Sequence, residues 1–216
     1  FIIGLIFIFI VPPFQKPDEN THYLNVASIL EGNLFCNKSN IYQKKFLDFE
    51  KEMKVSNFAF NYLSKFPVSL IKENLYKNFT DNTLEKNSFC ISPFGYITVI
   101  PGMLLFTNKL LLGFYFARLL GFLFFLTCLF WSFKILDKKY HFILYIYSLL
   151  PMLLHQVTAI NYDVVQMSLV MPIFSYLIFF ILNKRISCKK IILFIFLIFW
   201  FQLVKPSYFF LIFIWF

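Results

Sequence analysis

The sequence predicts an all-α integral membrane protein, a multi-span helical bundle with a large first extracytoplasmic loop. Apolar residues make up 59% of the chain and the mean hydropathy is +0.70, whereas soluble domains contain roughly 45–50% apolar residues. Several apolar stretches approach or exceed the ~20 residues that a helix needs to cross a bilayer. The excess of basic residues gathers in two short segments, which is typical of cytoplasmic loops.

The chain divides into three parts. Residues 1–11 predict a truncated first transmembrane helix, because so short an apolar run cannot cross about 30 Å of hydrocarbon. Residues 12–110 predict an extracytoplasmic loop, and residues 111–216 predict a transmembrane bundle truncated at its C-terminus. Because the chain opens without Met and both of its ends lie in apolar runs, we expect a fragment of a longer protein.

Two segments of the loop have a structure of their own. A short amphipathic helix is predicted from Asp18 to Glu31, lying on the membrane surface or packed on the bundle. Pro17 suits its first turn, and apolar residues recur at helical spacing at Tyr23, Val26, Ala27 and Leu30. The apolar segment 93–106 would be only about 21 Å long as a helix, so we expect a re-entrant or surface-lying piece.

Four apolar segments follow the loop. The first is a full span, the second is kinked at Pro151 and the third contains Pro172, while the fourth meets Lys205-Pro206; these segments are Leu111–Phe133, His141–Ile160, Val164–Leu182 and Ile191–Val204. Placing the basic segments 134–139 and 184–190 in the cytoplasm leaves the large loop and the turn at residues 161–163 outside. If residues 93–106 crossed the membrane instead, this orientation would be inverted.

The net charge of +9 does not indicate a nucleic-acid partner. The large loop has nearly equal numbers of lysines and acidic residues, and the excess lies in the two basic segments. The cysteines show no spacing typical of a zinc site. Cys36 and Cys90 share the loop, where a disulfide and two free thiols both remain open.

Asp18 and Glu19 are the candidates for catalysis. A carboxylate can accept the proton of an acceptor hydroxyl, and a carboxylate pair can hold a divalent cation such as Mg²⁺ or Mn²⁺. His22 follows at helical spacing, so the three side chains can share one face. The alternative is structural, since carboxylates also cap a helix N-terminus and favour its dipole.

Two cations and one carboxylate lie at the predicted outer half of the bundle. Arg118 could clamp a lipid phosphate or snorkel to the interface. Lys205 lies deep in a single span, or at the outer surface if the chain turns at Pro206. Asp163 could pair with Lys205 or cap the helix that starts at Val164. Acids and cations from distant parts of the chain thus converge, which suits an anionic lipid-linked donor and a hydroxyl acceptor.

The stretch Pro12-Pro13-Phe14-Gln15-Lys16-Pro17-Asp18-Glu19-Asn20-Thr21-His22-Tyr23, with Gly32 after it, resembles the opening of domain-of-unknown-function family 2142. That bacterial membrane-protein family is grouped with the GT-C glycosyltransferases. Asn161-Tyr162-Asp163 and Lys205-Pro206-Ser207-Tyr208 resemble later motifs, and Arg118 stands where a basic residue is expected. The resemblance covers nearly the whole chain.

This resemblance implies a GT-C-like bundle in the bacterial cell membrane. It implies sugar transfer, usually with inversion, from a polyprenyl-phosphate donor to a cell-envelope glycan acceptor on the extracytoplasmic side. Asp18 and Glu19 would then be the catalytic or metal-binding pair. We expect the substrate to be bound by His22, Arg118, Tyr162, Asp163 and Lys205.

Two functions without catalysis compete with this interpretation. A transporter or flippase of envelope-glycan assembly would carry charged residues down the bundle toward the cytoplasmic side, and the sequence places none clearly there. A structural component of the same assembly would keep its function when Arg118 and Lys205 are replaced.

Overall fold

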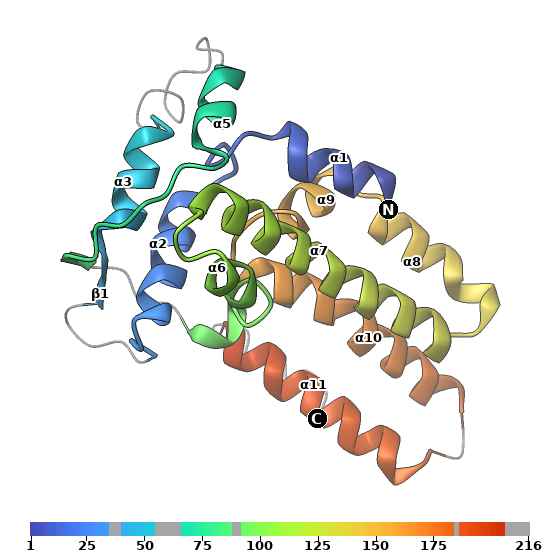
Figure 1. Ribbon diagram of the computed structural model, residues 1–216. Helices are drawn as coiled ribbons and strands as arrows, with labels where there is room; N and C mark the ends of the chain where they lie inside the picture. Colours follow the sequence, from blue (N-terminus) through green and yellow to red (C-terminus); the bar gives the residue numbers. More distant parts are fainter. Residues whose placement is uncertain (35–39, 55–65, 88–91, 184–185, 206–216) are drawn as a thin grey trace.

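A computed structural model describes residues 1–34, 40–54, 66–87, 92–183 and 186–205. The described part is mostly helical, as expected, and consists of an elongated bundle of apolar helices with a polar lobe at one end (Figure 1). A small antiparallel sheet of two strands in the lobe adds to the expected all-α architecture. Cys36 and Cys90, and with them their predicted relationship, lie outside the described residues.

The bundle is built around one long helix, α7 (Leu110–Ile135). It packs against α1 (Ile2–Ile10) and α10 (Asp163–Leu182), and α11 (Cys188–Val204) packs on α10. Within the described ranges, α7 and α10 are the helices long and apolar enough to cross a membrane. Both coincide closely with predicted spans.

The predicted span over residues 141–160 is broken rather than kinked. It forms α8 (His141–Ser148) and α9 (Pro151–Val157), separated by two residues. Leu150 is extended, with φ −60° and ψ 122°, because the residue before a proline avoids the helical region. Pro151 then opens the second helix at a position where its missing N–H costs nothing.

The lobe is held to the bundle by an aromatic core. Its helices are α2 (Glu19–Leu30), α3 (Lys44–Glu52) and α5 (Val68–Asn74), and its sheet pairs β1 (Asn40–Gln43) with β2 (Leu84–Asn87). Rings from the lobe and from α7 pack against one another, at Phe14, Tyr23, Phe49, Phe79 and Phe114. Because α2 is buried on nearly all sides, it packs on the bundle instead of lying on a membrane surface.

Residues 93–106 turn back on themselves. A single turn of 3-10 helix (Pro93–Gly95) leads into α6 (Ile100–Leu105), which packs against α7 directly after it in the chain. At Gly102 a Cβ would lie 2.5 Å from the backbone of Ala117, so the close approach of these helices requires glycine. The short helix and its return fit the expected re-entrant or surface-lying piece better than a crossing.

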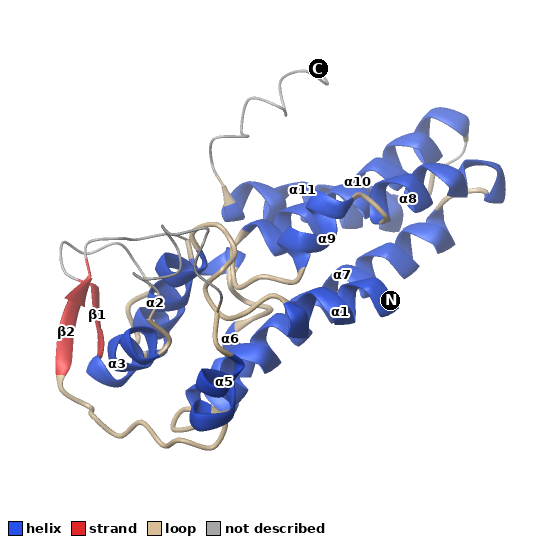
Figure 2. Cartoon of the chain, turned by 90° about the horizontal axis from the view of Figure 1, so that it is seen from above, coloured by secondary structure: helices blue, strands red, loops and turns tan. Residues whose placement is uncertain are grey.

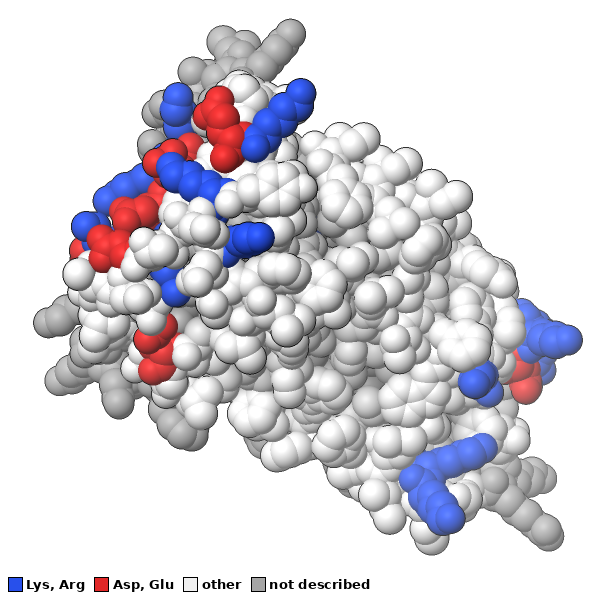
Figure 3. Space-filling view, in the orientation of Figure 1, with Lys and Arg blue, Asp and Glu red and all other residues white. Residues whose placement is uncertain are grey.

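Charged side chains occupy the two ends of the molecule. Figure 3 shows them over the lobe and at the opposite end, with a wide uncharged belt between. The distant end lies at the end of α7 and the start of α11, and it carries Lys134, Lys138, Lys139, Lys189 and Lys190. Many large apolar side chains of the belt are exposed, for example on α1, α8 and α11. Such a surface is unfavourable in water and is the one that lipid would cover.

Figure 2, which shows the molecule from above, has the strands and α3 set apart from the apolar helices. Three helix ends lie toward the lobe, namely the start of α7, the start of α10 and the end of α11. The basic segments lie at the opposite ends of these helices. The candidate residues of the sequence belong to this junction between lobe and bundle.

Candidate functional site

A buried ion pair joins the lobe to the bundle. Arg118 on α7 and Glu19 at the start of α2 are both 0% exposed. The Arg118 Nε donates to Glu19 Oε1 at 2.8 Å, and its Nη2 donates to Oε2 at 2.6 Å. This bidentate geometry is the strongest form of an ion pair between arginine and a carboxylate.

Every donor of Arg118 is occupied. A guanidinium has five N–H groups, and the three that do not contact Glu19 reach the backbone at the end of α1. They donate to the carbonyl oxygens of Ile8 at 3.0 Å, Val11 at 2.7 Å and Pro12 at 3.1 Å. Arg118 therefore satisfies carbonyl groups that the helix leaves without a partner. It does not snorkel, and it has no donor left for a phosphate in this arrangement.

Every acceptor position of Glu19 is occupied as well. Besides Arg118, its Oε1 accepts the backbone N–H of Ile160 at 3.0 Å, and its Oε2 accepts that of Phe14 at 3.1 Å. A carboxylate offers about four lone-pair sites. Glu19 could act as a base or metal ligand only after one of these contacts opened.

Lys16 forms a second buried contact beside the ion pair. Its side chain is 3% exposed, and its Nζ donates to the carbonyl oxygen of Thr158 at 2.5 Å and to its hydroxyl at 2.6 Å. Burial, and next the charge of Arg118, lower the pKa of Lys16 to about 6, while Glu19 opposes this shift. Residues 158–160 are thus fixed by two hydrogen-bonded contacts, from Lys16 to Thr158 and from Ile160 to Glu19.

The segment held in this way leads into the second cluster of candidate residues. The ring of Tyr162 lies edge-on to His22, with 4.9 Å between centroids, and the Nζ of Lys205 lies 5.2 Å from the centre of the same ring. Asp163 follows in the chain and interacts electrostatically with Lys205. Four predicted residues, from α2, from the start of α10 and from the end of α11, therefore meet: His22, Tyr162, Asp163 and Lys205.

Tyr96 completes this cluster, which we call the junction cluster: His22, Tyr96, Tyr162, Asp163 and Lys205. The His22 Nδ1 lies 2.6 Å from the Tyr96 hydroxyl. Burial lowers the pKa of His22, against the opposing charges of Asp18 and Glu19. The tautomer of the imidazole decides which of the two groups donates in this hydrogen bond.

Asp163 is the first residue of α10 and does not cap this helix. The Oδ1 of Asn161 accepts the backbone N–H of Val164 at 2.9 Å and performs this role. The capping alternative for Asp163 was therefore wrong, and its carboxylate is available to Lys205. α11 ends at Val204, and Lys205 is extended, so the lysine does not lie in the middle of a continuous helix.

Asp18 differs from its neighbour Glu19 in its exposure and its contacts. It is exposed, and its φ of 55° places it in the left-handed region, which aspartate tolerates better than most residues. Its charge acts on His22. Of the predicted acidic pair, Asp18 alone presents a carboxylate to solvent beside the junction cluster.

The residues of the predicted acidic pair do not fit a metal ion well. Glu19 has no free lone pair, and the described part of the chain contains no group of three or more His, Cys, Asp and Glu side chains that could hold one. Asp18 alone would be too few protein ligands for an all-protein site. We therefore derive no step through a metal.

Sequence reasoning missed Lys16, Tyr96 and Thr158. Lys16 lies within the quoted opening motif, between two prolines and the acidic pair, and that position was a signal for it. Tyr96 and Thr158 have no distinguishing local pattern, because both matter through partners more than seventy residues away in the chain.

Comparison with known proteins agrees with the membrane character of the chain. A family model described as "Predicted membrane protein (DUF2142)" matches residues 1–216, which is the whole chain. No curated protein and no solved structure matches the chain.

Proposed function

The chain belongs to the DUF2142 family of predicted membrane proteins, and we propose that it is part of a multi-span, GT-C-like glycosyltransferase of the cell membrane. In this proposal it transfers a sugar from a polyprenyl-phosphate donor to a cell-envelope glycan on the extracytoplasmic side. The observation that carries the proposal is the junction cluster beside exposed Asp18, at the end of the bundle opposite the basic segments.

The cluster supplies the charges that the reaction requires. Lys205 would face the donor phosphate, since a lysine ammonium is a compact charge suited to phosphate. The rings of Tyr162 and His22 would lie against the sugar. Asp163 would orient Lys205 or a sugar hydroxyl.

Asp18 would act as the general base. The acceptor hydroxyl oxygen attacks the anomeric carbon while the bond from that carbon to the phosphate oxygen breaks. The hydroxyl proton passes to the carboxylate, and polyprenyl phosphate leaves with the electron pair of the broken bond. General-base assistance of this kind contributes about 10²–10⁴-fold to a rate.

Glu19 and Arg118 take a different part from the one that the resemblance implied. Their mutual bonds, and the bond from Ile160 to Glu19, align the start of α2 with the segment before Tyr162 and Asp163. In the proposal they are positioning residues, because their hydrogen-bonding capacity is already used.

The test is an assay of the complete protein in proteoliposomes with labelled polyprenyl-phosphate sugars and envelope glycan. We expect Asp18→Asn and Lys205→Met each to lower transfer by about 100-fold or more. Asp18 and Glu31 flank the two ends of α2, and Glu31 is exposed. Glu31→Gln is therefore the matched control and should leave transfer intact. Unchanged transfer in Asp18→Asn together with Asp163→Asn would refute the assignment. Movement of the labelled lipid across the bilayer without any product would instead indicate a flippase.

A further inference from the structure

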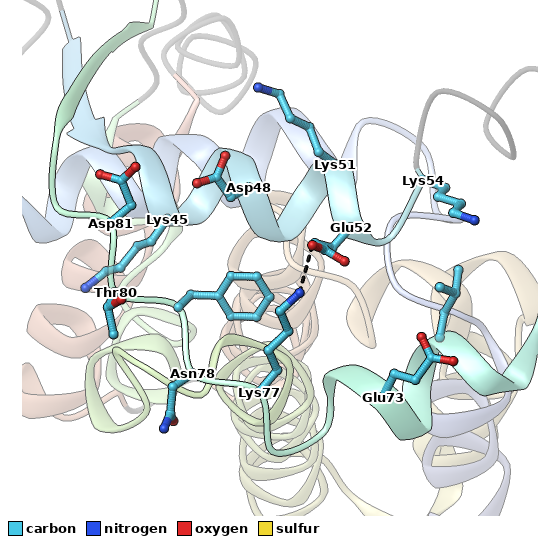
Figure 4. Close-up of a pocket in the computed structure, with 12 residues that line it drawn as sticks. Lys45, Asp48, Lys51, Glu52, Lys54, Glu73, Lys77, Asn78, Thr80 and Asp81 are labelled. Atoms are coloured by element: carbon cyan, nitrogen blue, oxygen red, sulfur yellow. Dashed lines mark ion pairs between the residues drawn. The ribbon is translucent and has the colours of Figure 1, made fainter.

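The lobe contains a groove that lies outside the junction cluster. It has a volume of about 700 Å³ and runs between α3, α5 and the segment 77–81 (Figure 4). This volume falls within the range of about 300–1,000 Å³ that is typical of ligand sites. Its lining is unusual for such a site, because ten of its twelve residues are polar or charged and only Leu70 and Phe79 are apolar.

Lys45 is the distinctive residue of the groove. Its side chain is 6% exposed, yet within the described part of the chain its ammonium group has no hydrogen bond or ion pair. The ammonium lies 5.5 Å from the centre of the Phe46 ring, and burial lowers the pKa of Lys45 although Glu31 opposes the shift. The ammonium group reaches the groove without a hydrogen-bonded partner among the described residues, so its charge is open to an anionic ligand group. A hydrogen bond between two charged groups is stronger than one between neutral groups.

The other charges of the groove largely balance. Lys77 pairs with Glu52 at 2.7 Å, and Asp81 pairs at 3.2 Å with Lys44, which is not part of the lining. The lining holds four lysines and four acidic residues, together with Asn78 and Thr80. A polyphosphate or another dense polyanion would meet these carboxylates and be repelled. The lining suits a ligand that is rich in neutral hydroxyl groups and carries an isolated negative charge.

We propose that this groove binds an acidic oligosaccharide, with Lys45 receiving the carboxylate of a uronic acid and the neighbouring polar side chains receiving hydroxyl groups. Figure 4 shows Lys45 and Thr80 toward one end of the groove, and Lys54 and Glu73 toward the other. The carboxylate therefore lies at the Lys45 end, and the chain of sugars extends along α3. The further step, that this oligosaccharide is the acceptor of sugar transfer, rests on the proposed function, whereas the binding itself does not.

Binding is tested with the purified chain in nanodiscs and three tetrasaccharides. The probes are an aldotetraouronic acid, which is a xylotriose that carries a single glucuronic acid, its methyl ester, which lacks the negative charge, and neutral xylotetraose. We expect titration calorimetry to detect the aldotetraouronic acid with a dissociation constant below about 10 mM. The ester and the neutral sugar should bind at least about tenfold more weakly, because each lacks a hydrogen bond to a charged group.

Variants identify the residue responsible. Lys45→Met keeps the buried stem but removes the charge, and should weaken the binding of the aldotetraouronic acid to the level of its ester. Lys138→Met, an exposed lysine at the opposite end of the molecule, is the matched control and should bind as the unaltered chain does. Thr80→Val tests the same end of the groove without removing a buried charge, and an unchanged unfolding temperature shows that each variant is folded.

Three results would overturn the proposal. The first is no saturable binding of the aldotetraouronic acid to the unaltered chain. The second is equal binding of the acid and its ester, and the third is full binding by folded Lys45→Met. The binding experiment contains no polyprenyl-phosphate sugar, so its failure leaves the proposal of sugar transfer standing. Conversely, a failure of the Asp18 and Lys205 variants in the transfer assay leaves the groove as a binding site.

Discussion

Arg118 and Glu19 are 99 residues apart in the chain and form a bidentate, fully buried ion pair, with donor–acceptor distances of 2.8 and 2.6 Å. The pair lies where α1, residues 11–14, α2, α7 and Ile160 meet. Its remaining hydrogen bonds all reach backbone groups of α1, of residues 11–14 and of Ile160. It therefore connects the lobe, the bundle and the junction cluster through one contact.

Breaking this pair from one side should destabilise the protein strongly. Glu19→Gln leaves the guanidinium buried without a countercharge, which costs about 3–5 kcal/mol. The free energy of unfolding, measured with denaturant in detergent micelles, should fall by that amount. The double variant Glu19→Gln, Arg118→Met should lose less than the sum of the two single variants, because the first replacement already removes the interaction. Additive losses would mean that the two side chains do not interact in the folded protein.

Lys16 predicts a pH dependence of stability. Its pKa is about 6 in the folded chain against an ordinary value of 10.5, so between these values the unfolded chain binds the extra proton. The free energy of unfolding should therefore rise with pH across this window, by at most about 1.4 kcal/mol per pH unit from this group. Below about pH 6 both states are protonated, and the contribution to the slope vanishes.

The variant Lys16→Met isolates this contribution. Thermal unfolding between about pH 6 and 9 should show a shallower rise of stability with pH in the variant than in the unaltered chain. Lys138→Met, an exposed lysine, is the control and should retain the full slope. Parallel curves for the unaltered chain and Lys16→Met would contradict the burial of a largely neutral lysine.

Asn161 should prove necessary for the start of α10. Asn161→Ala removes the side-chain oxygen that accepts the N–H of Val164, so we expect a loss of about 0.5–2 kcal/mol in the free energy of unfolding. Asn161→Asp keeps an acceptor oxygen and should lose less. If the alanine and aspartate variants were equally stable, the cap would not be made by this side chain.

Gly102 should tolerate no side chain. A Cβ there would lie 2.5 Å from the backbone of Ala117, which cannot move aside without shifting α7. We expect Gly102→Ala to cost about 1–3 kcal/mol. Gly121→Ala is the comparison, because its nearest neighbour is a side-chain atom of Val164 at 3.2 Å, which can adjust. Equal unfolding temperatures for the two variants would contradict the close packing of α6 on α7.

The helices could be predicted well because their signals are local. The span expected from Leu111 to Phe133 appears as Leu110–Ile135, and the one expected from Val164 to Leu182 appears as Asp163–Leu182. The helix expected from Asp18 to Glu31 appears as Glu19–Leu30. The break before Pro151 was expected only as a kink, since a proline limits the backbone but packing decides how far the helix opens.

The roles of the candidate residues could be predicted less well. Asp18 and Glu19 are neighbours with the same charge, and no local pattern distinguishes the exposed carboxylate from the buried one. Arg118 was expected to face a phosphate or the interface. Its actual partners could not be foreseen, because they lie about a hundred residues away along the chain. Lys16 and Tyr96 were missed for the same reason.

Hydropathy, prolines and the placement of lysines are properties of short stretches, and they were enough to establish apolar helices, their interruptions and the two charged ends. Which acid meets which cation depends on how these helices pack, since a side chain finds its partner only after distant segments have come together. The tertiary structure alone therefore decided that Glu19 and Arg118 satisfy one another and that Asp18, His22, Asp163 and Lys205 remain beside one another at the junction of lobe and bundle.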